Sequence, residues 1–122
     1  MMAKVLVVDD SPTDVYQFKD MLEELGHVVL TAANGKEGVA MANAEQPDLV
    51  LMDIVMPDMN GFQATRQICR GAATSHIPVI IVTRKDQEAD KVWGERQGAR
   101  AYITKPIDRP GLMSVIESVI DK

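Results

Sequence analysis

The chain has 122 residues, of which 46% are hydrophobic and 25% charged, and its formal net charge is −5 at pH 7. This length suits one hydrophobic core, so we expect a single domain over residues 1–122 with no output domain attached. The acidic balance, without a block of Lys or Arg, argues against a nucleic-acid-binding surface. The single cysteine, Cys69, excludes an internal disulfide and a cysteine zinc cage. No apolar run has the length or context of a signal peptide or membrane span, so we expect a cytoplasmic protein without membrane insertion.

Short apolar runs alternate with longer amphipathic segments along the chain. The runs are rich in β-branched and aliphatic residues and predict five strands: KVLVV (4–8), VVLTA (28–32), DLVLMD (48–53), PVIIVT (78–83) and RAYIT (100–104). Three of them are almost continuously hydrophobic, which is typical of parallel strands that are covered on both faces.

Helical patterns lie between and after these runs. The first helix is predicted from Val15, Phe18, Leu22 and Leu25, with Ser11 or Thr13 as its N-cap and Gly26 at its end. Weaker helices are predicted near 36–45, 61–70 and 86–97 from their bounding Asn-Gly and Gly residues. The last helix carries one apolar stripe: Leu112, Val115, Ile116, Val119 and Ile120. The alternation predicts an α/β fold, a (βα)5 doubly wound five-stranded parallel sheet.

Ligands of doubly wound folds bind beyond the carboxyl ends of the strands, and polar residues follow four of the five predicted strands. Asp9 and Asp10 follow the first strand and Asp53 the third, while Thr83 ends the fourth and Lys105 follows the fifth. The second strand contributes only Thr31 and small residues, as expected of an edge strand. We therefore expect three carboxylates, one hydroxyl and one amine to converge on one site.

Such a cluster has the equipment for phosphoryl transfer. Three neighbouring carboxylates repel one another, and Mg²⁺, which prefers carboxylates, waters and phosphate oxygens, relieves that repulsion. Lys105 offers a point charge for a phosphate oxygen, and Thr83 can donate one hydrogen bond to an anion. Asp53 is the candidate nucleophile, because an ionised carboxylate can carry a phosphoryl group without a general base.

The stretches VVDDS, DLVLMDIVMPDMNG, VIIVT and YITKP resemble the signature of the response-regulator receiver domain, the fold of the chemotaxis protein CheY, from end to end. The resemblance implies the strand order 2-1-3-4-5, Asp53 as phosphoacceptor, and Mg²⁺ bound by Asp10, by Asp53, by the main-chain carbonyl of Val55, and by Asp9 through water. It also implies Thr83 as the switch hydroxyl, Lys105 as the phosphate-pairing lysine and Tyr102 as the switch aromatic.

The same resemblance implies partners rather than a catalysed reaction. A histidine kinase or histidine phosphotransfer domain would donate the phosphoryl group, and a downstream target protein would bind the face of the fourth helix, fifth strand and fifth helix. The protein would promote only its own phosphorylation and dephosphorylation. The stretches GFQATRQ and KDQEADKVWGERQGARAYITKP more narrowly resemble PilH-type regulators of type IV pilus twitching motility.

Three positions depart from the best-known members of this family. The residue after Thr83 is often small there but is Arg84 here, so its side chain either points outward or partly gates the site. Val55 and Lys85 occupy positions that help set the lifetime of the phosphoryl group in the family, and an apolar Val55 cannot orient an attacking water.

Simpler interpretations remain open for single residues. Asp9 and Asp10 can cap a helix, Asp53 can begin a turn before Asn60-Gly61, and Lys105 can be a surface lysine. Trp93 can belong to the core or to an interface, and Cys69 fits core packing better than redox sensing. His27 and His76 are too few for a metal cluster, so a phosphorylated histidine must come from a partner.

Other function classes are less favoured. A small Mg²⁺-dependent phosphohydrolase needs a second carboxylate two residues after its nucleophile, where this chain has Val55. A flavodoxin-like protein needs a hydroxyl- and glycine-rich phosphate loop, where this chain has acids. A receiver that serves as a phosphate sink or as a phosphorylation-independent interaction module remains an alternative.

Overall fold

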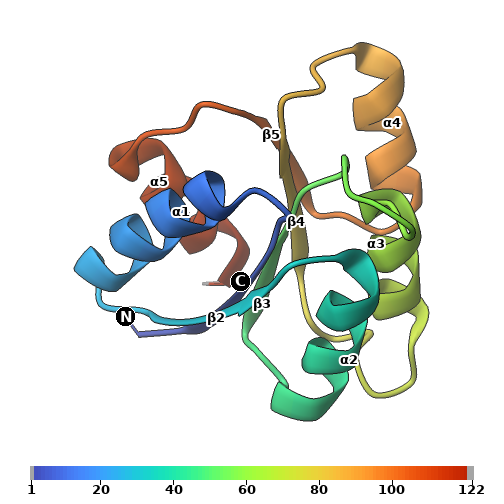
Figure 1. Cartoon of the computed structure of the whole chain (residues 1–122), viewed down its shortest axis with the longest axis horizontal. Helices are drawn as coiled ribbons and strands as arrows, with labels where there is room; N and C mark the ends of the chain where they lie inside the picture. The colour runs from blue at the N-terminus through green and yellow to red at the C-terminus, as the bar shows by residue number, and fades with distance from the viewer. Residues whose placement is uncertain (1, 121–122) are drawn as a thin grey trace.

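The computed structural model describes residues 2–120 and contains one five-stranded parallel sheet in the order β2-β1-β3-β4-β5 (Figure 1). The elements follow one another as β1 (Lys4–Val8), α1 (Pro12–Glu24), β2 (Val28–Ala32), α2 (Gly35–Glu45), β3 (Leu49–Met52), α3 (Gly61–Arg70), β4 (Val79–Thr83), α4 (Glu88–Arg96), β5 (Ala101–Thr104) and α5 (Arg109–Ile120). The predicted (βα)5 doubly wound fold and its strand order are therefore confirmed.

Local capping decides where the first helix begins. Ser11, rather than Thr13, is the N-cap of α1, because its hydroxyl accepts a hydrogen bond from the amide of Asp14. The weak helix predicted over 86–97 is shorter, from Glu88 to Arg96, and its N-cap Gln87 forms no side-chain capping bond. Helix ends without such a bond carry little signal in the sequence.

Helices cover both faces of the sheet, so the central strands are buried on both sides. In Figure 1, α1 and α5 lie on one face of the sheet and α2, α3 and α4 on the other. Phe18 and Leu22 of α1 pack with Leu112 and Ile116 of α5 in one core cluster, and a second cluster joins α2 and α3 to the opposite side chains of β1 and β3. Every residue of β3 and β4 is buried, as the continuous hydrophobic runs predict.

The strands all end at one edge of the sheet, which is the upper edge in Figure 1. Backbone pairing continues one residue beyond three of them: the amide of Asp9 donates to Ala32 (3.1 Å), that of Asp53 to Val8 (2.9 Å) and that of Lys105 to Thr83 (2.7 Å). These bonds fix the backbone of the three charged residues against the sheet, so their side chains start from rigid positions.

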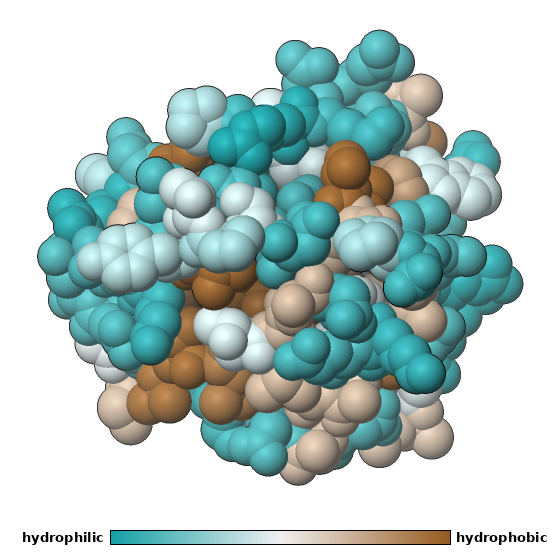
Figure 2. Space-filling view, in the orientation of Figure 1, coloured by the Kyte–Doolittle hydropathy of each residue, from teal (hydrophilic) through white to brown (hydrophobic). Residues whose placement is uncertain are grey.

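The molecular surface is mostly hydrophilic in the view of Figure 2, with hydrophobic residues gathered over the edge strand β2 between α1 and α2. Val28 of this strand is 49% exposed. Among residues 2–120, no helix combines the length and the apolar character that crossing a membrane requires.

Candidate functional site

Three aspartates meet at the carboxyl edge of the sheet. One carboxylate oxygen from each of Asp9, Asp10 and Asp53 lies within 4.8 Å of the others, although the residues come from two loops more than 40 positions apart. Asp9 and Asp53 are buried and Asp10 is exposed. One oxygen of Asp9 also accepts a hydrogen bond from the amide of Ser11 (2.9 Å), a local turn contact, while the helix cap itself is Ser11 rather than Asp9 or Asp10.

Lys105 lies among these carboxylates with its side chain 4% exposed. Its Nζ is 2.7 Å from Asp9, 2.9 Å from Asp14 and 3.4 Å from Asp53. Burial raises the pKa of Asp9, while the hydrogen bond from Lys105 opposes that rise. Burial alone would lower the pKa of Lys105, but its bonds to Asp9 and Asp14 raise it, so the amine remains an ammonium ion. Lys105 therefore supplies the charge that holds the acids together.

Asp14 is the site residue that the sequence analysis missed. Its carboxylate comes from the first turn of α1, is 5% exposed, and accepts hydrogen bonds from Lys105 and from Nη1 of Arg84 (2.8 Å). Nη2 of Arg84 lies 3.3 Å from the other oxygen, which gives a two-pronged contact. The Arg84 guanidinium holds the pKa of Asp14 at about 2, below its usual range.

A signal for Asp14 was present in the sequence. Asp14, Phe18 and Leu22 follow each other at intervals of four, so the acid lies on the buried stripe of the first helix. An acid in that position needs a cation, and Arg84 stands where a small residue is common. Neither predicted position of Arg84 describes it fully: its side chain is 69% exposed, but its guanidinium turns back to pair with Asp14 and lines the pocket.

Thr83 has no hydrogen-bond partner for its hydroxyl among the described residues, although the side chain is fully buried. An unpaired buried hydroxyl is costly, typically by about 1–3 kcal/mol. The pocket that Thr83 lines is also lined by Asp10, Asp14, Asp53 and Arg84. The unpaired hydroxyl therefore belongs to a residue of the same pocket as Asp53.

The loop after β3 shapes the floor and rim of this pocket. The amide of Ile54 donates to the Asp53 carboxylate (2.7 Å), and the amide of Gly61 donates to the carbonyl of Ile54 (3.0 Å). A Cβ atom at Gly61 would overlap the carbonyl oxygen of Asp53, so glycine permits this close return of the chain. Val55, on the same loop, is 57% exposed at the pocket.

Comparison with known proteins identifies the family to which the chain belongs. The response regulator receiver domain pattern matches residues 5–117. The chain belongs to that family. Protein PilH of Pseudomonas aeruginosa is 63% identical over 119 residues, which cover 98% of each chain. A polar-differentiation response regulator, DivK of Brucella anthropi, is 33% identical over 98% of each chain.

Solved structures of receiver domains share the architecture. The chemotaxis protein CheY4 of Vibrio cholerae superimposes with a TM-score of 0.91 at 30% identity, covering 98% of this chain and 99% of that one. The receiver domain of a sensor histidine kinase of Pseudomonas aeruginosa, which has a magnesium ion coordinated in its active-site cleft, gives a TM-score of 0.92 at 28% identity over 100% of both chains. The chain is thus a CheY-like receiver of two-component signalling.

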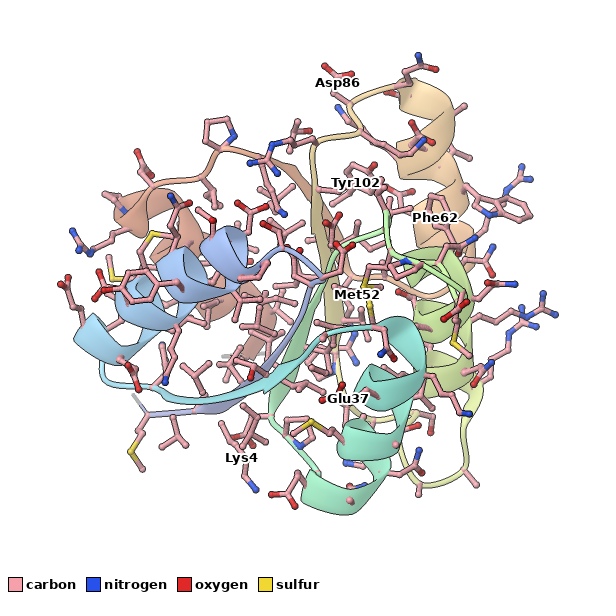
Figure 3. All side chains as sticks on the ribbon, in the orientation of Figure 1. Lys4, Glu37, Met52, Phe62, Asp86 and Tyr102 are labelled. Atoms are coloured by element: carbon pink, nitrogen blue, oxygen red, sulfur yellow. The ribbon has the colours of Figure 1, made fainter. Side chains whose placement is uncertain are left out.

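Tyr102 of this receiver does not line the pocket shared by Asp10, Asp14 and Asp53. Its ring packs with Ile54, Ile81 and Phe62, and its hydroxyl donates to the carbonyl of Lys85 (2.7 Å) (Figure 3). Burial, followed by nearby acidic side chains, raises the pKa of Tyr102 to about 12, so the hydroxyl remains a donor. Tyr102 therefore fastens the loop after β4 to β5.

The remaining predicted candidates stand apart from the pocket. Trp93 is 48% exposed on α4, which excludes the core interpretation and leaves the interface one. Cys69 packs beside the α2–α3 core cluster, and burial raises the pKa of its thiol, which agrees with a packing role. Nδ1 of His27 accepts a hydrogen bond from the amide of Ala3 (3.0 Å), and His76 is exposed.

Proposed function

We propose that this receiver accepts a phosphoryl group on Asp53 from a histidine kinase or a histidine phosphotransfer domain. One oxygen of Asp53 would attack the phosphorus of the phosphohistidine, and the bond from phosphorus to the imidazole nitrogen would break with its electron pair going to the imidazole. The observation that carries the proposal is the position of Asp53 within reach of both an ammonium ion and two further carboxylates. No other described carboxylate combines these neighbours with an opening to solvent beside a buried, unpaired hydroxyl.

The acidic residues fit a resident Mg²⁺ ion. Asp10 and Asp53 would bind it directly, Asp9 through water, and the main-chain carbonyl of Val55 would complete the protein ligands. Oxygen donors from two carboxylates and a carbonyl are the set that Mg²⁺ prefers. When bound, the ion would neutralise charge that develops on the phosphoryl oxygens. Support comes from the 4.8 Å cluster and from the repulsion within it, which a single lysine must otherwise balance.

Lys105 and Thr83 would recognise the attached phosphoryl group. The ammonium ion already lies 3.4 Å from Asp53 and needs only a small displacement to pair with a phosphoryl oxygen. The Thr83 hydroxyl would gain the hydrogen bond that it lacks. Tyr102 would follow as the switch aromatic, because its bond to the Lys85 carbonyl couples it to the loop that Thr83 begins.

The signal would leave through a binding surface formed by α4, β5 and α5, where a downstream target protein would dock. Trp93 and Val92 are 48% and 40% exposed on α4, and large exposed apolar residues of this kind mark interaction surfaces. The 63% identity with PilH supports a role in twitching motility, carried out in the cytoplasm.

Labelling with a small phosphodonor tests the proposed acceptor. The wild type, Asp53→Asn and Asp86→Asn would be incubated with acetyl phosphate, with and without Mg²⁺, and analysed by intact mass and peptide mapping. Asp86 is an exposed aspartate of the β4–α4 loop and serves as the matched control (Figure 3). We expect Mg²⁺-dependent labelling of the wild type and of Asp86→Asn but none of Asp53→Asn. Labelling of Asp53→Asn at the wild-type level would place the acceptor elsewhere.

A further inference from the structure

Asp14 competes with the proposed acceptor Asp53 for Lys105. Asp14 accepts a hydrogen bond from Nζ at 2.9 Å, which is shorter than the 3.4 Å from Nζ to Asp53. In the unphosphorylated chain the lysine thus lies closer to Asp9 and Asp14 than to the proposed acceptor. A phosphoryl group on Asp53 draws the lysine away from this position.

If Lys105 moves to a phosphoryl group on Asp53, Asp14 loses this counter-ion. The Asp14 side chain is only 7% exposed, and an ionised carboxylate without a partner in such a place is strongly destabilised. A site with Lys105 and Asp14 alone would therefore resist the movement that phosphorylation requires.

Arg84 removes that obstacle. Its guanidinium donates to both oxygens of Asp14, at 2.8 and 3.3 Å, and its own side chain is 69% exposed. The contact on one of these oxygens is shared with Lys105, so Asp14 already has a second cation before the lysine leaves. Arginine suits this role, because it pairs with a carboxylate in a two-pronged geometry and stays charged.

We propose that Asp14 and Arg84 are positioning residues for the phosphoryl switch, with Asp14 holding Lys105 in the resting state and Arg84 replacing it as the counter-ion of Asp14 when the phosphoryl group takes the lysine. This inference rests on the proposed function of Asp53. It assigns Arg84 no contact with the phosphoryl group, and so differs from a direct phosphate ligand and from a gate that blocks entry.

A double-mutant cycle separates these roles. Trifluoroberyllate, a mimic of the phosphoryl group, would be titrated with Mg²⁺ into the wild type, Arg84→Ala, Asp14→Asn and the double variant, with bound fluoride measured by ¹⁹F NMR. The Asn side chain keeps the shape of Asp14 and an acceptor for Lys105 but needs no counter-ion. We expect Arg84→Ala to weaken binding about tenfold, within the range of coupling energies between residues in contact. In the Asp14→Asn background the same substitution should change binding less than twofold.

Controls exclude a general charge effect and a folding defect. Arg96→Ala removes the same charge from an exposed position on α4 and should leave binding unchanged. Arg84→Lys should recover part of the lost affinity, because it restores a cation beside Asp14. Mg²⁺ affinity without trifluoroberyllate should not fall in Arg84→Ala, because the variant removes a positive charge from the pocket.

Three outcomes overturn the inference. Equal weakening by Arg84→Ala in both backgrounds would mean that the guanidinium contacts the anion directly. Stronger binding or faster uptake by Arg84→Ala would make the residue a gate, and an unchanged affinity would give it no role. Absence of Mg²⁺-dependent trifluoroberyllate binding in the wild type, or binding that persists in Asp53→Asn, would instead refute the proposed function, so the two failures are distinguishable.

Discussion

Replacing Lys105 by methionine tests how far one ammonium ion holds the acidic cluster together. The methionine keeps most of the side-chain volume beside Phe18, whose ring centroid is 5.8 Å from Nζ, but removes the charge that lies 2.7 Å from Asp9 and 2.9 Å from Asp14. Removing one partner of a buried ion pair typically costs about 3–5 kcal/mol, because the remaining charge is uncompensated. Arg84 still pairs with Asp14, so we expect the free energy of unfolding to fall by an amount at the lower end of this range, about 3 kcal/mol.

Urea unfolding followed by circular dichroism measures this loss, at neutral pH with a chelator present. Saturating Mg²⁺ should then stabilise Lys105→Met more than the wild type, because the ion takes over the balancing of the carboxylates. Lys19→Met, which alters an exposed lysine of α1, should change stability by less than about 0.5 kcal/mol. A loss below about 1 kcal/mol for Lys105→Met, the value of an exposed pair, would refute the assignment of Lys105 as the central counter-ion.

Three further predictions concern the same pocket. Asp10→Ala should weaken Mg²⁺ binding at least about tenfold in a calorimetric titration, whereas Asp86→Ala should not, and equal affinities would contradict the ligand assignment. The pKa of Asp14 is lowered from 3.8 to about 2, so its ion pair stabilises the fold above pH 3.8 and that stability is lost as the pH falls through 2. The difference in unfolding free energy between the wild type and Asp14→Asn, roughly 1–2 kcal/mol at neutral pH after screening at the exposed guanidinium, should vanish over that interval, and a pH-independent difference would count against the pairing. Gly61→Ala should cost about 1–3 kcal/mol in thermal unfolding, because the new methyl group overlaps the Asp53 carbonyl, and a neutral effect would mean that the loop relaxes freely.

The sequence was sufficient to predict the fold because the hydrophobic pattern carries the topology. The runs at 4–8, 48–53 and 78–83 are apolar without alternation, and the strands within them are buried on both faces. Residues that directly follow a strand could be placed as well, because the carboxyl ends of parallel strands meet at one edge. The sequence therefore predicts Asp9, Asp53 and Lys105 as neighbours, and in the structure Lys105 contacts both acids.

The sequence does not predict Asp14 as a site residue, because its contact with Lys105 depends on how the first helix is oriented relative to the sheet. It is the only one of the site carboxylates that lies on a helix, and an acid in a first helical turn ordinarily serves the helix dipole at the surface. Only the packing of α1 against the sheet turns that side chain toward Lys105. The direction of Arg84 was open for the same reason, since the strand end fixes its backbone but not the reach of a long side chain.

A crystal structure of the receiver with Mg²⁺ and trifluoroberyllate tests the central claim most directly. The account predicts one Mg²⁺ ion bound by Asp10, by Asp53 and by the Val55 carbonyl. It also predicts trifluoroberyllate attached to Asp53, with Lys105 moved from Asp14 to contact the trifluoroberyllate. A Mg²⁺ ion held by other residues, or trifluoroberyllate bound away from Asp53, would contradict the account.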